Sequence, residues 1–93
     1  MKHNILVKFK KETEYKEMLS DITALFNGLK DIDGINDVII HTNCINRDNR
    51  YDLLIQIDMD KSILLVYDEC SVHKTWKEKY GKYIDKKAIF DYE

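Results

Sequence analysis

Residues 3–9, "HNILVKF", decide how the rest of the sequence is interpreted. These residues alternate between two environments, which is typical of a β-strand because successive side chains point to opposite faces of a sheet. One face carries His3, Ile5, Val7 and Phe9, and the other carries Asn4, Leu6 and Lys8. The first face is largely apolar, so we expect the neighbouring segments to cover it.

The next segment predicts a helix over roughly residues 13–31. Its apolar residues recur three and four positions apart, which places them in one stripe along a helix. Thr13 is expected to be the N-cap, and Gly34 is expected to mark the end of the helical segment. The stripe consists of Tyr15, Met18, Leu19, Ile22, Leu25, Phe26 and Leu29.

The rest of the chain predicts three more strands and a second helical region. Residues 35–45 are rich in β-branched side chains, "NRDN" at 46–49 is typical of a turn, and residues 50–58 alternate again. A helical region is expected from residue 60 or 62, with a break near Cys70 and a continuation to residue 84. Residues 86–92, "KKAIFDY", predict the last strand.

This order, β-α-β-β-α-β, predicts an α+β chain with a ferredoxin-like fold. Residues 1–93 are expected to form a single domain, with one four-stranded antiparallel sheet and both helical regions on one face. The other face would carry a mixed set of side chains, including Leu6 and Leu54. A half-apolar open face favours a partner, so we expect the chain to pair with itself through this face as a dimeric α/β barrel.

Composition excludes several classes of protein. Hydrophobic residues make up 44% and charged residues 34% of the chain, which indicates a folded domain. Basic and acidic residues are intermixed with a net charge of −2, so a nucleic-acid partner is not expected. The first apolar run is too short for a signal sequence or a membrane span. We therefore expect a cytoplasmic protein without a membrane partner.

"YDECSVHKTW", residues 67–76, contains the candidate reactive groups. An imidazole such as that of His73 can act as a base, and the Tyr67 phenol can donate a hydrogen bond to a developing oxyanion. Both residues could equally be core side chains with satisfied polar atoms. Cys70 is expected to be a small buried side chain. His3 falls on the apolar face of the first strand, which carries no carboxylate, so no metal site is expected.

Four segments together resemble the stress-responsive A/B barrel domain (Dabb) family of dimeric α/β barrels: "KHNILVKFK", "NRYDLLIQID", "SVHKTW" and "IFDY". The resemblance implies a pocket between helices and sheet and no metal or organic cofactor. A plant polyketide cyclase of the family has a catalytic tyrosine and histidine that match Tyr67 and His73. Cys70 and Ser71 depart from the family pattern, which has histidine and proline at these positions.

The resemblance also implies a ligand-binding role for nine further residues. His3 matches a pocket histidine, and the others match pocket-wall positions: Ile5, Val7, Ile22, Leu25, Phe26, Leu53, Ile55 and Ile89.

Three functions remain open from the sequence. The first is a homodimeric barrel that binds a small hydrophobic or polyketide-like ligand in an apolar pocket. The second is a cofactor-independent enzyme, such as a cyclase that closes a ring by aldol chemistry or a lyase, with His73 as base and Tyr67 as hydrogen-bond donor. The third is a stress-associated structural dimer without a ligand.

Overall fold

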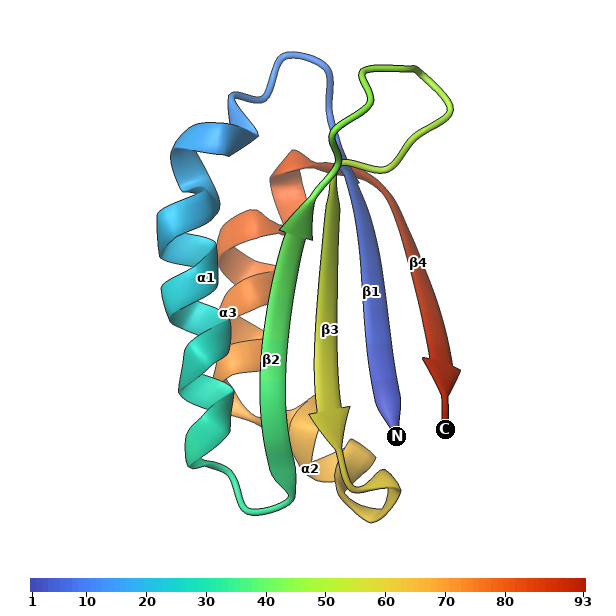
Figure 1. Ribbon diagram of the computed structural model, residues 1–93. Coiled ribbons are helices and arrows are strands. Elements are labelled where there is room, and N and C mark those ends of the chain that lie inside the picture. Colours follow the sequence, from blue (N-terminus) through green and yellow to red (C-terminus); the bar gives the residue numbers. More distant parts are fainter.

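The computed structural model describes residues 1–93 and confirms the predicted order of elements. Four strands and three α-helices follow one another along the chain (Figure 1). The predicted second helical region is divided into two helices, as the expected break near Cys70 requires. The elements are β1 (Lys2–Phe9), α1 (Leu19–Asn27), β2 (Ile35–Thr42), β3 (Leu53–Met59), α2 (Leu64–Glu69), α3 (Ser71–Tyr80) and β4 (Ile84–Tyr92).

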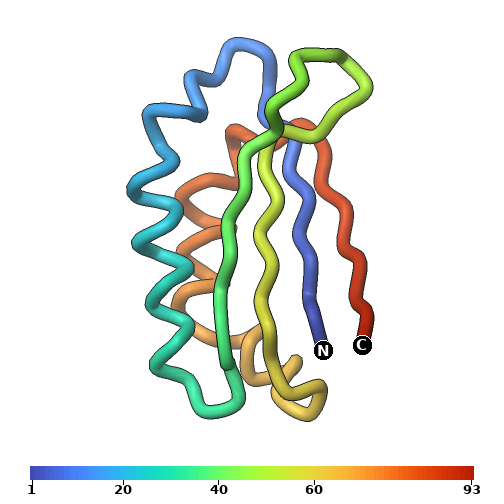
Figure 2. Tube along the Cα trace, in the orientation of Figure 1, coloured from blue at the N-terminus to red at the C-terminus, as the bar shows by residue number.

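The four strands form one antiparallel sheet in the order β2-β3-β1-β4, so β1 and β3 lie in the centre. The helices cover one face of the sheet, as expected (Figures 1 and 2). They lie toward β2, whereas β4 forms the opposite edge and has little helical backing. The two chain ends lie side by side because Lys2 on β1 pairs with Tyr92 on β4.

The predicted alternation is confirmed in the central strands. His3, Ile5, Val7 and Phe9 are buried, and so are the residues of β3 that face the helices. Side chains from all three α-helices complete the core, and each large apolar side chain that is fully buried contributes about 1.5–3 kcal/mol. The largest of these core residues are Trp76, Tyr67, Phe26, Ile22, Leu29, Leu53, Ile55, Ile57 and Met59.

Several boundaries differ from the prediction. Thr13 does not cap the first helix, because it belongs to the turn that leaves β1 and its backbone N–H donates to the carbonyl of Lys10. The chain then forms a short 3-10 helix at Tyr15–Met18, and α1 begins at Leu19. In addition, β2 ends at Thr42 and not at residue 45, β3 begins at Leu53 and not at residue 50, and β4 begins at Ile84 and not at residue 86.

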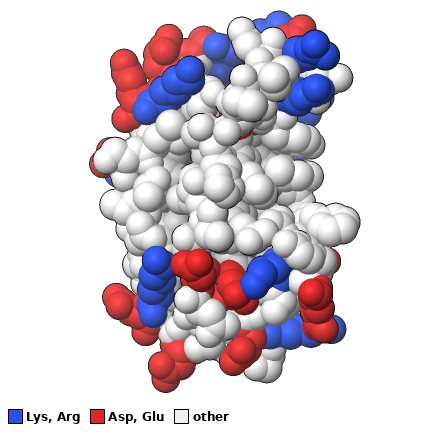
Figure 3. Space-filling view, in the orientation of Figure 1, with Lys and Arg blue, Asp and Glu red and all other residues white.

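The open sheet face, formed by the outward side chains of the four strands, is partly apolar, as expected. Its exposed apolar residues include Ile39 and Phe90, the latter 65% exposed. Near them Gln56 donates two hydrogen bonds from its amide nitrogen, one to Asn4 and one to the Tyr92 hydroxyl. Figure 3, which views this face, shows charged side chains gathered at the two ends and a belt without charges between them.

None of the helices combines the length and the apolar character needed to cross a lipid bilayer.

Gly34 offers a test of the turn between the first helical segment and β2. Its φ of +96° suits glycine, and an added Cβ would lie 3.1 Å from the side chain of Ile63. Gly34→Ala should therefore lower the free energy of unfolding by about 1–2 kcal/mol in urea denaturation. The matched control is Gly81→Ala, since an added Cβ there meets nothing within 4 Å. Equal stability of the two variants would contradict this account of the turn.

Candidate functional site

A cavity of about 270 Å³ lies between the helical layer and β4. We call it the tyrosine–histidine cavity. The cavity is open here because β4 lies at the edge of the sheet and no helix packs directly over it. Four elements contribute to its lining. The lining residues are His3 and Ile5 from β1, Leu64, Tyr67 and Asp68 from α2, His73 and Trp76 from α3, and Lys87, Ile89 and Asp91 from β4.

The break at Cys70 brings Tyr67 and His73 together. On a continuous helix, residues six positions apart would be rotated by about 240° and would point in different directions. Here Cys70 is extended, with ψ of 161°, and separates α2 from α3. Its Sγ accepts a hydrogen bond from the backbone N–H of His73 at 3.5 Å and so caps α3. As a result the rings of Tyr67 and His73 lie 4.8 Å apart between centroids.

His73 is held in one tautomer. Its Nδ1 lies 2.9 Å from the backbone carbonyl oxygen of Asp68. Because a carbonyl can only accept, Nδ1 carries the hydrogen, and in the neutral ring Nε2 keeps its lone pair. The side chain can therefore act as a base or a hydrogen-bond acceptor through Nε2.

Tyr67 has a buried hydroxyl without a hydrogen-bond partner. The residue is 1% exposed, and its hydroxyl oxygen is the buried side-chain polar atom that nothing in the protein satisfies. Burial, reinforced by Cys70 and the Asp68 carboxylate, raises the pKa of this hydroxyl far above its ordinary value of about 10. Tyr67 therefore stays protonated at neutral pH and can donate a hydrogen bond.

His3 pairs with Asp91 from the opposite end of the chain. Its Nδ1 lies 2.5 Å from a carboxylate oxygen of Asp91, and its ring meets the edge of Tyr67 at a centroid distance of 5.3 Å. The carboxylate fixes the imidazole and the imidazole packs against the phenol. The first strand itself carries no carboxylate on this face, as the sequence indicated, but Asp91 on the neighbouring strand β4 supplies one.

Three of the predicted site residues besides Tyr67 and His73 line the cavity: His3, Ile5 and Ile89. The other six predicted pocket-wall residues do not border it, and their assignment to a ligand stays a prediction. Five of them are fully packed in the core, and Leu25 is partly buried against it. The five are Val7, Ile22, Phe26, Leu53 and Ile55.

Sequence reasoning missed five lining residues. The sequence alone gave no site role to Trp76, Leu64 or Asp68. Lys87 and Asp91 could have been found only by knowing which residues of β4 stand opposite Val7 and His3.

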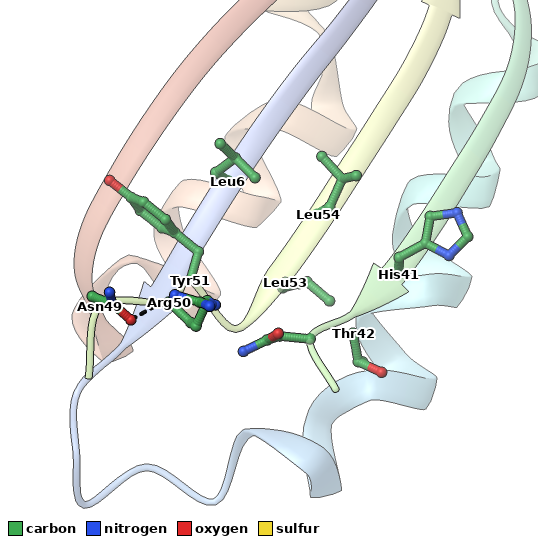
Figure 4. A pocket seen from close by; sticks show the side chains of 9 residues that line it. Leu6, His41, Thr42, Asn49, Arg50, Tyr51, Leu53 and Leu54 are labelled. Atoms are coloured by element: carbon green, nitrogen blue, oxygen red, sulfur yellow. Dashed lines mark hydrogen bonds between the residues drawn. The ribbon is translucent and has the colours of Figure 1, made fainter. Parts of the chain in front are cut away.

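A second hollow, of about 370 Å³, lies on the open sheet face where the loop between β2 and β3 meets the sheet (Figure 4). Leu6 and Leu54 rise from the sheet toward it, and Tyr51 lies beside them. Arg50 donates to the side-chain oxygen of Asn49 at 2.7 Å. This hollow holds no buried unpaired polar atom, which distinguishes it from the tyrosine–histidine cavity.

No group of three or more His, Cys, Asp or Glu side chains is arranged to hold a metal ion.

Comparison with solved structures identifies the architecture. A Dabb family protein with a ferredoxin-like fold from Mesorhizobium loti superimposes with a TM-score of 0.74 at 15% identity, covering 99% of this chain and 93% of the other. The chain has the fold of a Dabb family protein. The fold expected from the sequence resemblance is thus confirmed. No family model matches the sequence, and no curated protein matches it.

Two further solved structures share this fold, one of a protein of unknown function and one of an enzyme. A dimeric ferredoxin-like protein of unknown function from Thermobifida fusca superimposes with a TM-score of 0.80 at 11% identity, covering 96% of this chain and 85% of the other. The hydroxynitrile lyase of Passiflora edulis gives a TM-score of 0.76 at 11% identity, covering 98% and 89%. At such identities the similarity establishes the shared fold alone.

The unpaired hydroxyl of Tyr67 leads to a stability prediction. Tyr67→Phe removes a buried polar group that has no partner and leaves the ring in place, so it should raise the free energy of unfolding of the ligand-free protein by about 1 kcal/mol. Urea denaturation measures the change. Tyr80→Phe is the control, because the Tyr80 ring is also buried but its hydroxyl is not an unpaired buried atom. A loss of stability in Tyr67→Phe would mean that the hydroxyl already has a partner.

Proposed function

We propose that this chain is a cytoplasmic, homodimeric binding protein that takes a small hydrophobic ligand into the tyrosine–histidine cavity of each subunit. The observation that carries the proposal is that Tyr67 lines the cavity while its hydroxyl is buried and unpaired. A buried donor without a partner costs about 1–3 kcal/mol. A ligand that accepts its hydrogen bond recovers that free energy on binding.

The surroundings of the hydroxyl support a binding site. Apolar walls from Ile5, Leu64 and Ile89 combine with a few polar groups, which is typical of sites for small molecules. The polar groups are also fixed in position, since His73 is held by the Asp68 carbonyl and His3 by Asp91. Fixed partners reduce the entropy that a ligand has to overcome when it binds.

The open sheet face supports the homodimer. Its uncharged belt contains exposed apolar side chains, among them Ile39 and Phe90, that water contacts in the monomer. A second copy placed over this face would bury them and close the two sheets into a barrel. Proteins of the same fold from Bacteroides fragilis and Thermobifida fusca are described as dimeric.

A second candidate function is a cofactor-independent enzyme, a cyclase or a lyase, at the same site. The observation that favours it is the free Nε2 of His73, on a ring whose centroid lies 4.8 Å from that of Tyr67, together with a Tyr67 hydroxyl that stays protonated. Nε2 would take a proton from a carbon next to a carbonyl group. The electron pair would move to the carbonyl oxygen, where the Tyr67 hydroxyl would stabilise the charge. The Passiflora edulis enzyme supports this candidate as an example of lyase chemistry on the same fold.

The remaining candidate, a structural dimer without a ligand, would leave the tyrosine–histidine cavity without a role.

A ligand screen followed by one substitution separates these functions. At least one compound from a set of small aromatic and β-keto compounds should raise the melting temperature. If the protein is an enzyme, His73→Ala should abolish turnover of that compound while its affinity changes little, because the imidazole is half exposed and the other walls remain. If His73→Ala weakens binding and no turnover is found, the binding function alone stands. A screen without any stabilising compound would leave the structural dimer.

The dimer is tested by a charge placed on the open sheet face. Leu54→Lys puts an ammonium group among the side chains that the partner would cover, so sedimentation velocity should show a monomer. Leu65→Lys is the matched control, because Leu65 lies on α2 on the other side of the sheet and is already 74% exposed. A dimer that survives Leu54→Lys would show that another surface makes the contact.

A further inference from the structure

The tyrosine–histidine cavity is small. Its volume of about 270 Å³ lies below the roughly 300–1,000 Å³ of sites that enclose drug-sized ligands. An apolar ligand must therefore be short if it is to be enclosed. A long polyketide chain would extend out of the cavity past β4.

The core prevents the cavity from extending deeper toward α1. Trp76 forms the inner wall, and the ring of Phe26 packs against it edge to face at a centroid distance of 5.1 Å. Phe26 and Ile55 are 0% exposed, so no free space continues behind that wall. Several residues that the family resemblance assigns to a pocket wall thus fill the space that a longer ligand would need.

Among the polar groups of the cavity, one donor lacks a hydrogen-bond acceptor that a ligand could supply. The Tyr67 hydroxyl is buried and unpaired, while Nδ1 of His73 and Nδ1 of His3 already donate within the protein. His73 is half exposed, so water can reach its ring and no ligand donor is required there. A carbonyl oxygen is the strongest neutral acceptor that an otherwise apolar compound can offer to a phenol.

Charges around the cavity disfavour a charged ligand. Lys87 and Asp91 lie on β4 on either side of Ile89, and Asp68 lies on α2. Charges of both signs therefore border the cavity, and the Asp91 carboxylate is already paired with His3. The walls between them are apolar and would not solvate an ion.

From the volume, the closed inner wall and the single unpaired donor, we propose that the ligand is a small neutral carbonyl compound. It has one ring or a short alkyl body, and its carbonyl oxygen accepts the hydrogen bond of Tyr67. This inference rests on the proposed binding function and narrows it. It applies equally to a substrate if the protein is an enzyme.

NMR titration of the full chain with four related compounds tests both parts of the proposal, the carbonyl oxygen and the short body of the ligand. Acetophenone has the ring and the carbonyl, ethylbenzene has nearly the same shape without the oxygen, 1-phenylethanol replaces the carbonyl by a hydroxyl, and octanophenone adds a long chain. Acetophenone should bind most tightly and shift the signals of residues around the cavity. The advantage over ethylbenzene should be about fivefold, the usual value for one neutral hydrogen bond.

Substitutions in the protein test whether the compounds bind in the tyrosine–histidine cavity. Tyr67→Phe should remove the advantage of acetophenone over ethylbenzene. Leu64→Ala enlarges the cavity and should improve binding of octanophenone relative to acetophenone, whereas Leu65→Ala, the same change at an exposed neighbour outside the cavity, should not.

Three results would overturn the inference. They are tighter binding of octanophenone than of acetophenone in the unmodified protein, tighter binding of the alcohol than of the ketone, and an unchanged carbonyl advantage in Tyr67→Phe. In each of these cases a ligand still binds, so the proposed binding function survives. If none of the four binds but a compound without a carbonyl group from the broad screen does, the carbonyl inference alone fails. If no compound binds at all, the binding function fails with it.

Discussion

The register of β1 between its two neighbours is the constraint on which the tyrosine–histidine cavity depends. His3 stands opposite Asp91 on β4, and Ile5 stands opposite Ile55 on β3 and Ile89 on β4. Because side chains alternate along a strand, a slip of one residue would turn Asn4 and Leu6 toward the helices and remove both the imidazole and its wall. The one irregularity in the pairing of β1 with β4 lies between Lys8 and Phe9, at the end of the strand away from the cavity.

The second constraint is the interruption of the helical region at Cys70. Two short helices that meet at an extended residue present Tyr67 and His73 to the same space, which one straight helix would not do. Cys70 also accepts the backbone N–H of His73, so the residue that ends α2 also begins α3. The thiol therefore has a structural role as a cap, although the sequence alone suggested only a small buried side chain.

Polar side chains on the two faces of the sheet differ in whether they have hydrogen-bond partners. On the open sheet face, hydrogen bonds from the Gln56 amide nitrogen join it to Asn4 and Tyr92. On the covered face, the Tyr67 hydroxyl is left without a partner even though packing holds its ring between His3 and His73. A rigid, unsatisfied donor beside a fixed imidazole is costly for folding and useful for binding, which is the usual relation between stability and function at a site.

The sequence by itself determined the order of the elements, the alternation of β1 and β3 and the break at Cys70, because each of these depends on local spacing. The pair Tyr67–His73 was singled out by the family resemblance, since the spacing of the two residues alone also fits core packing. The sequence also determined the fold class, since the order β-α-β-β-α-β permits few arrangements. It did not determine the extent of the cavity or the partner of His3. Those depend on which residues stand opposite one another across the sheet and on how Phe26 and Trp76 pack, and such contacts join residues far apart in the chain. Only the tertiary structure decided that Asp91 meets His3, that Val7, Ile22 and Phe26 fill the core, and that the remaining space is small.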